Sequence, residues 1–175
     1  MNGHPIAAES KPSVMGQPPD YSEPWYAGGL HFSCVRCSVC CRHESGYVLL
    51  SHSDLRALAG FCRLSPAVFA GQYCRWVTTD GGKRLSLQET AVPNGYDCVF
   101  WKGGCTVYAA RPCQCRTYPF WPYMLLSREM WEAAAKDCPG TRQPALVDFA
   151  AIQRNLIDEA ENQKNQIKGP EELDE

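Results

Sequence analysis

The chain has 175 residues, of which 45% are hydrophobic, and its formal net charge at pH 7 is −2. This length suits a single domain of ordinary size, and the composition provides enough apolar residues for a core. A weakly acidic chain lacks the basic surface that nucleic-acid binding needs, and no run of about 20 apolar residues predicts a membrane span. Residues 1–6 lack the features of a secretory signal, so we expect a cytoplasmic protein with no nucleic-acid and no membrane partner.

The 11 cysteines are the most informative part of the composition. In a cytoplasmic protein, so many cysteines favour metal binding or redox chemistry over a disulfide framework, which an odd number would also leave incomplete. Adjacent cysteines do occur in disulfide knots, so a disulfide framework stays as the alternative.

The chain begins with residues 1–24, which contain five prolines and few large apolar side chains, a pattern typical of a disordered arm. Four cysteines follow within eight residues, in the order Cys-x2-Cys-x2-Cys-Cys: Cys34, Cys37, Cys40 and Cys41. Thiolates bind zinc and iron–sulfur clusters, and the first three cysteines repeat the spacing that begins the bacterial ferredoxin motif. The sequence therefore predicts a metal site here. Because neighbouring side chains diverge, we expect only one of Cys40 and Cys41 to bind a mononuclear ion.

The next elements are short. Residues 46–50 form an apolar run that predicts a strand, and a helix is expected from Ser53 to about Gly60. Ser65 and the proline after it predict a second helix, with serine at the N-cap. A turn signal at residues 80–82 between two β-type runs predicts a hairpin.

The second half of the chain is rich in turns. Two short extended pieces are expected at 98–101 and 105–108, and residues 111–122, with three prolines and a group of aromatic residues, predict a rigid, non-helical segment. A helix capped by Ser127 and a last amphipathic helix over 146–163 follow, and then an acidic tail that we expect to be frayed. The predicted organisation is an arm (1–24), one small, irregular α+β domain of short helices and hairpins around a metal centre (25–163), and the tail (164–175).

The cysteine-containing motifs follow one another in a specific order: Phe32-x-Cys34-x2-Cys37-x2-Cys40-Cys41, Asp97-Cys98-Val99-Phe100, Gly104-Cys105-Thr106-Val107-Tyr108, Arg111-Pro112-x2-Cys115-Arg116-Thr117-Tyr118-Pro119-Phe120 and Cys138-Pro139-Gly140. Together, from about Trp25 to Gly140, they resemble the YkgJ-like cysteine-cluster (CxxCxxCC) family, a zinc- or iron-chelating domain that distantly includes flagellin lysine-N-methylase. The resemblance implies eight metal-binding cysteines: Cys34, Cys37, Cys40, Cys41, Cys98, Cys105, Cys115 and Cys138. Cys62, Cys74 and Cys113 fall outside it, and we expect Cys62 and Cys74 to be core thiols.

The leading hypothesis is a protein that holds an iron–sulfur cluster (4Fe-4S) or zinc on a subset of these eight cysteines. Cys34, Cys37 and one of the adjacent pair would form the near wall of the site, and Cys115 and Cys138 are the preferred distal ligands. Cys98 and Cys105 would complete a second site.

Two arginines are expected to act as cofactor-binding residues. Arg111 and Arg116 would balance thiolate charge and donate hydrogen bonds to sulfur, which tunes a metal centre. Ordinary pairing with surface carboxylates is the alternative for both.

Three functions fit such a site: a redox or group-transfer enzyme, a metal-trafficking module, or a structural-metal domain with a protein partner. The relation to the methylase leaves methyl transfer open. The sequence contains no phosphate-loop, dinucleotide-binding or serine-nucleophile motif. These motifs would indicate a class of enzyme, so without them the sequence leaves open whether the protein is an enzyme.

Overall fold

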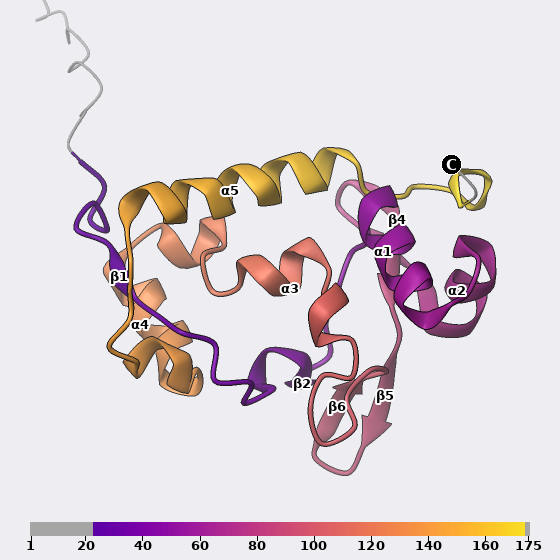
Figure 1. Cartoon of the computed structure of the whole chain (residues 1–175), viewed down its shortest axis with the longest axis horizontal. Helices are drawn as coiled ribbons and strands as arrows, with labels where there is room; N and C mark the ends of the chain where they lie inside the picture. The colour runs from indigo at the N-terminus through magenta and orange to yellow at the C-terminus, as the bar shows by residue number, and fades with distance from the viewer. Residues whose placement is uncertain (1–22, 174–175) are drawn as a thin grey trace, which may run out of the picture.

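The computed structural model describes residues 23–173, so the arm predicted for 1–24 lies almost wholly outside the described residues. Within this part of the chain the fold is a small, irregular α+β domain, as the sequence predicts (Figure 1). The described residues form five α-helices: α1 (His52–Cys62), α2 (Pro66–Tyr73), α3 (Cys113–Thr117), α4 (Arg128–Asp137) and α5 (Phe149–Lys164). Across residues 23–173, none of the helices combines the length and the apolar character that a membrane crossing requires.

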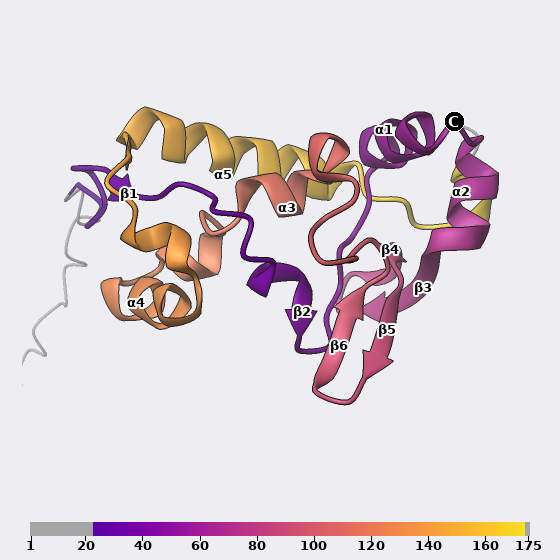
Figure 2. The same cartoon turned by 60° about the horizontal axis from the view of Figure 1, so that its bottom comes forward.

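The strands pair in three small antiparallel groups. The first joins β1 (Leu30–His31) to β7 (Leu146–Val147), the second has the order β2 (Arg42–His43), β6 (Gly95–Cys98) and β5 (Glu89–Val92), and the third is the hairpin of β3 (Cys74–Thr79) and β4 (Gly82–Leu87). Figures 1 and 2 show α5 and α3 together on one side of the molecule, with β5 and β6 projecting from the other side.

Each of the four longer helices begins where a side chain caps its first turn. The N-cap residues are Ser51, Ser65, Ser127 and Asp148, whose side-chain oxygens accept hydrogen bonds from backbone N–H groups of the following turn. The helices predicted after Ser65 and Ser127 are therefore confirmed. The first helix is also confirmed, although its capping residue is Ser51 rather than Ser53. The predicted hairpin is present, with Gly82 at a φ of +93°, which glycine adopts without strain.

The prediction that residues 111–122 are non-helical is wrong for α3. The prolines flank this short helix instead of interrupting it, since Pro112 occupies the N-cap position and Pro119 follows the helix end. The first free N–H of the helix, that of Cys113, donates to the Asp54 carboxylate at 2.8 Å. A distant residue therefore satisfies the donor that a helix start leaves exposed.

The segment that follows α5 also differs from the frayed tail suggested by the sequence. Gln166 forms a β-bridge with Ser51, and the Ile167 side chain is fully buried in the core. The Ile167 N–H donates to the Leu50 carbonyl at 3.0 Å. Burying one isoleucine contributes about 2 kcal/mol, which favours the ordered position of the segment around Ile167.

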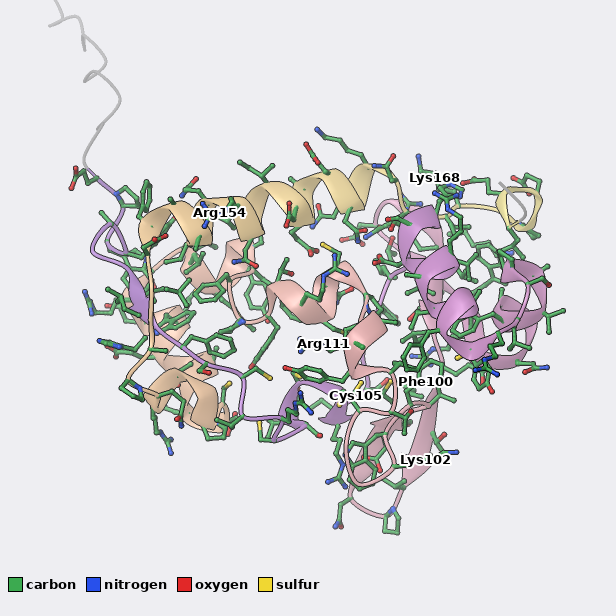
Figure 3. All side chains as sticks on the ribbon, in the orientation of Figure 1. Phe100, Lys102, Cys105, Arg111, Arg154 and Lys168 are labelled. Carbon is green, nitrogen blue, oxygen red and sulfur yellow. The ribbon has the colours of Figure 1, made fainter. Side chains whose placement is uncertain are left out.

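Two apolar clusters form the core. One contains residues of α1, α2, β3 and β4 together with Phe100, Val107 and Ile167, and the other is built around Phe120, Trp131 and Ile152. Figure 3 shows Cys105 and Arg111 near the middle of the molecule beside Phe100, whereas Arg154 lies on the α5 side. Residues of both clusters or packed against them line the cavity that contains the cysteines.

Candidate metal centre

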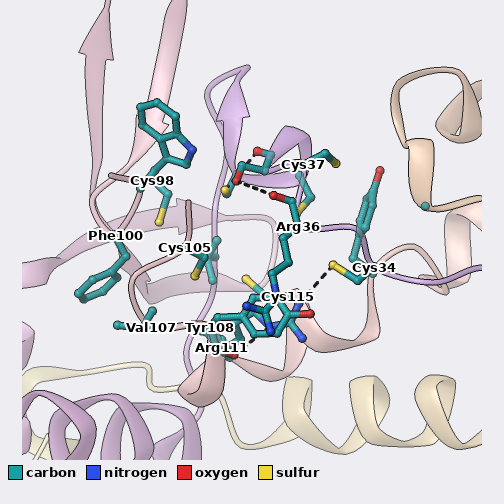
Figure 4. Close-up of a pocket in the computed structure, with 18 of the residues that line it drawn as sticks. Cys34, Arg36, Cys37, Cys98, Phe100, Cys105, Val107, Tyr108, Arg111 and Cys115 are labelled. Atoms are coloured by element: carbon teal, nitrogen blue, oxygen red, sulfur yellow. Dashed lines mark hydrogen bonds between the residues drawn. The ribbon is translucent and has the colours of Figure 1, made fainter. Parts of the chain in front are cut away.

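One cavity brings together cysteines of all five motifs. It has a volume of about 70 Å³, and its walls include Cys34, Cys37, Cys40, Cys41, Cys98, Cys105, Cys115 and Cys138. Cys62, Cys74 and Cys113 are not among its lining residues. All eleven cysteines lie in the described part of the chain, and all are free thiols. Figure 4 shows Cys98, Cys105 and Cys115 on three separate segments around this space, with Cys34 and Cys37 on another.

The loop that carries the first four cysteines turns through two residues with left-handed backbone conformation, Arg36 (φ 57°) and Ser38 (φ 67°). The Ser38 carbonyl accepts hydrogen bonds from both the N–H (3.1 Å) and the Sγ (3.2 Å) of Cys41. At the start of the loop, the Ser33 N–H donates to the Gly140 carbonyl at 3.0 Å. A Cβ atom at Gly140 would lie 2.8 Å from the Ser33 carbonyl oxygen, so glycine permits this close approach, which brings Cys34 near Cys138.

The position of Cys115 depends on α3, which is fixed on several sides. The Gln114 side chain accepts a hydrogen bond from the Leu49 N–H (3.0 Å) and donates to the Tyr47 carbonyl (2.8 Å). At the end of the helix, the Thr117 hydroxyl donates to the buried Glu159 carboxylate of α5 at 3.1 Å. These contacts leave Cys115 directed to the cavity.

Cys98 and Cys105 flank a tight loop. A β-bridge joins Trp101 to Cys105, and the Thr106 N–H donates to the Phe100 carbonyl at 3.0 Å. Arg42 attaches this loop to the cysteine stretch, because its guanidinium lies 3.7 Å from the centre of the Trp101 ring and its Nε is 2.7 Å from the Asp97 carboxylate.

Two arginines stand beside the thiols, stacked on one aromatic ring. The guanidinium carbons of Arg36 and Arg111 lie 4.0 Å and 3.7 Å from the centre of the Tyr108 ring. Arg111 Nη1 also donates to the Cys34 sulfur at 4.0 Å (Figure 4). Arg116 is placed differently: its Nη1 donates to the Arg111 carbonyl at 2.8 Å, so it supports the backbone of the residue that faces the sulfur.

The adjacent cysteines differ sharply in acidity. The single Cys41 thiol proton can serve either the Ser38 carbonyl or the Cys40 sulfur. A hydrogen bond from it to the Cys40 thiolate lowers the pKa of Cys40 to about 7, and the charge of Arg111 also favours the Cys40 thiolate. The same hydrogen bond raises the pKa of Cys41, and burial raises it further. The first of the two thiols to lose its proton is therefore Cys40.

Four further thiols of the cavity have raised pKa values. Burial is the main cause for Cys98, Cys105, Cys115 and Cys138, and the negative charge of Cys40 contributes to each. Cys98 and Cys105 also raise the pKa of Cys115, whereas Cys37 acts on Cys138. Accumulated thiolate charge in one small space favours a bound cation.

The donor set suits a soft metal centre. Among the described side chains, no histidine, aspartate or glutamate lines the cavity, so the ionisable donors found there are thiols apart from the Tyr108 and Tyr118 hydroxyls. Thiolates select zinc and iron–sulfur clusters. Within residues 23–173, no three His, Cys, Asp or Glu side chains form a preassembled ion site. The assignment of individual ligands stays a prediction.

The sequence did not indicate the residues that hold the site from outside. Asp54 and Gln114 act on α3 through contacts between distant segments, and neither lies in a recognisable motif. Tyr108 lies within a motif, but only the structure shows two arginines stacked on it.

No solved structure matches this chain. The profile of the CxxCxxCC family, described as a zinc- or iron-chelating domain, matches residues 33–139, which is more than half of the 175 residues. The matched range begins one residue before Cys34 and ends one residue after Cys138, so it contains every cysteine that lines the cavity. The chain belongs to the CxxCxxCC family of zinc- or iron-chelating domains.

Proposed function

We propose that this domain holds an iron–sulfur cluster of the 4Fe-4S type on thiolates of the cavity. The gathering of eight cysteines around one cavity, to the exclusion of the other three, is the observation that carries the proposal. Four thiolates are the usual ligand set of such a cluster. The eight thiols of the cavity are more than this number, and they lie on separate segments that a metal centre would link.

The size of the cavity supports a cluster over a single ion. Its volume is about 70 Å³, whereas about 10–15 Å³ is enough to hold one water molecule. A single zinc ion is no larger than a water molecule. The walls of the cavity would therefore have to move closer together for their thiols to coordinate it. A cluster of several atoms needs less movement of the backbone.

The arginines support the same proposal. A cluster on four thiolates carries net negative charge, and Arg36 and Arg111 are the cations that line the cavity. Hydrogen bonds to ligand sulfur and nearby positive charge set the reduction potential of a cluster. Arg111, with its contact to the Cys34 sulfur, is placed for that role.

Zinc is the second candidate, and one observation favours it. Cys40, Cys98, Cys105 and Cys115 act on one another electrostatically, which indicates four thiols in the same part of the cavity. Four thiolates complete a structural zinc site. Such a centre would stabilise the domain without catalysis.

Anaerobic purification followed by visible absorption spectroscopy and assays of iron, sulfide and zinc separates the two. A broad brown absorption band, with iron and sulfide in similar amounts, is the expected result. A colourless protein that contains stoichiometric zinc would overturn the cluster proposal in favour of the structural site.

A further inference from the structure

A second and larger cavity adjoins the first. Its volume is about 920 Å³, at the upper end of the roughly 300–1,000 Å³ found for ligand sites. Cys40, Cys41, Cys98, Cys115 and Tyr118 line both cavities, so the two spaces share a wall made of candidate ligand thiols. We call this second space the aromatic groove.

The name reflects the side chains on two of its walls. Tyr118, Trp121 and Tyr123 form a row, with ring centres 5.1 Å and 6.1 Å apart along it. The indole Nε1 of Trp121 donates to the Gln114 carbonyl at 3.0 Å, which fixes the middle of the row. Tyr47 lies on another part of the lining, and it is 48% exposed. Half-exposed aromatic rings in a groove are typical of surfaces that a partner covers.

The charge of the groove is negative. Among its described lining residues, Arg42 is the one lysine or arginine, and it pairs with Asp97. The Glu89 carboxylate pairs with Arg75 from outside the lining. Glu44 and Asp137 remain, both exposed, and within residues 23–173 neither carboxylate has a hydrogen-bond or ion-pair partner. Burial raises the pKa of Tyr123, and the charge of Glu44 raises it further, so a carboxylate and the end of the aromatic row lie near each other.

We propose that the aromatic groove binds an extended polypeptide segment through arginine side chains, which stack on the Tyr118–Trp121–Tyr123 row and pair with Glu44 and Asp137. A guanidinium group is flat, stacks on aromatic faces and pairs with carboxylates through two parallel hydrogen bonds. The protein already contains an arginine that stacks and pairs at once, since Arg42 stacks on Trp101 while its Nε bonds to the Asp97 carboxylate. The groove is large and its aromatic lining is open to solvent. Both features suit a polypeptide rather than a small metabolite. The proposal does not depend on which metal the first cavity holds.

Fluorescence polarisation on the protein as purified tests the proposal. The probe is a short fluorescein-labelled peptide in which arginine alternates with serine, and peptides with lysine or glutamate in place of arginine are the controls. The arginine peptide is expected to bind, the lysine peptide to bind more weakly and the glutamate peptide not to bind. Equal affinity for the lysine peptide would overturn the role of guanidinium stacking, and equal affinity for the glutamate peptide would overturn the proposal.

Two variants locate the binding site. Glu44→Gln/Asp137→Asn is expected to weaken binding of the arginine peptide about tenfold, because it removes two ion pairs. Tyr123→Leu is expected to weaken it as well. Asp158→Asn/Glu161→Gln makes the same change of charge on exposed positions of α5, and it should leave the affinity unchanged.

Metal content is measured on every variant, so that the two proposals can fail separately. Loss of peptide binding with metal retained supports the groove, whereas unchanged binding in both groove variants overturns it. A protein that lacks metal but binds the arginine peptide through Glu44 and Asp137 supports the groove and counts only against the proposed cluster.

Discussion

The Asp54 carboxylate accepts a hydrogen bond from the backbone N–H of Cys113, with 2.8 Å between Oδ1 and the nitrogen. Its other oxygen accepts hydrogen bonds from the N–H (3.3 Å) and the hydroxyl (2.9 Å) of Ser51. Asp54 is only 3% exposed. One buried carboxylate therefore caps α1 and also holds the start of α3, two residues before Cys115.

Asp54→Ala is expected to lower the free energy of unfolding by about 3 kcal/mol, because it removes a capping interaction and leaves buried N–H groups without acceptors. It should also speed the transfer of metal to a chelator, since α3 carries Cys115. Urea denaturation and chelator competition measure the two effects. Asp158→Ala on the exposed side of α5 is the control, and a similar stability for both variants would contradict this role of Asp54.

Cys115→Ser is expected to lose bound metal, because its thiol lines the cavity on a helix held in place from three directions. Cys62→Ser should keep the metal, because Cys62 lies at the end of α1 and outside the cavity. Metal analysis of both purified variants decides the matter. Equal metal loss in the two would show that the cavity does not define the ligand set.

Arg111→Gln is expected to lower the reduction potential of a bound cluster, because positive charge and a hydrogen bond to the Cys34 sulfur both favour the more negative, reduced state. A hydrogen bond of about 1 kcal/mol corresponds to roughly 40 mV for a one-electron couple. Arg116→Gln removes only a contact to the Arg111 carbonyl, so its shift should be smaller. Redox titration measures both, and a larger shift for Arg116→Gln would reverse their assigned roles.

In the metal-free protein, Cys40 is expected to react with iodoacetamide faster than the other cavity thiols near pH 7, because its pKa is lowered to about 7 and it is exposed. The rate should fall about tenfold for each pH unit below that value, as the thiolate is lost. Cys41→Ala removes the hydrogen-bond donor, so it should raise the pKa of Cys40 and slow the reaction at pH 7. Peptide mapping by mass spectrometry follows each cysteine, and an unchanged Cys40 profile in Cys41→Ala would refute the pairing. Buried Cys74, with a pKa raised by burial to about 12, is the unreactive reference.

The parts of the fold with local signals were predictable from the sequence. Serine caps at residues 65 and 127 and the glycine turn at 80–82 act within a few residues, and the structure has the expected helices and hairpin there. Elements that depend on distant partners were not predictable. The α3 helix needs Asp54, and burial of Ile167 needs Leu50 and the rest of the core.

For the site, too, local features were predictable from the sequence and features that depend on distant segments were not. Cysteine spacing indicated a metal site at Cys34 to Cys41, and the resemblance to the CxxCxxCC family implied which eight thiols belong together. The structure places all eight around one cavity. The arrangement of thiols within it depends on the fold. The difference in acidity between Cys40 and Cys41 follows from a hydrogen bond between their side chains that spacing alone does not reveal.

The hydrogen bond between Ser33 and Gly140 brings the two ends of the matched region together, and this affects how the protein can be made. On the ribosome, the first four cysteines emerge long before Gly140, at a rate of roughly 5–20 residues per second. The nascent chain therefore presents a group of unenclosed thiols to the cell for on the order of 5–20 s. The two ends of the matched region can therefore enclose the cavity only after the residues up to Gly140 have been synthesised.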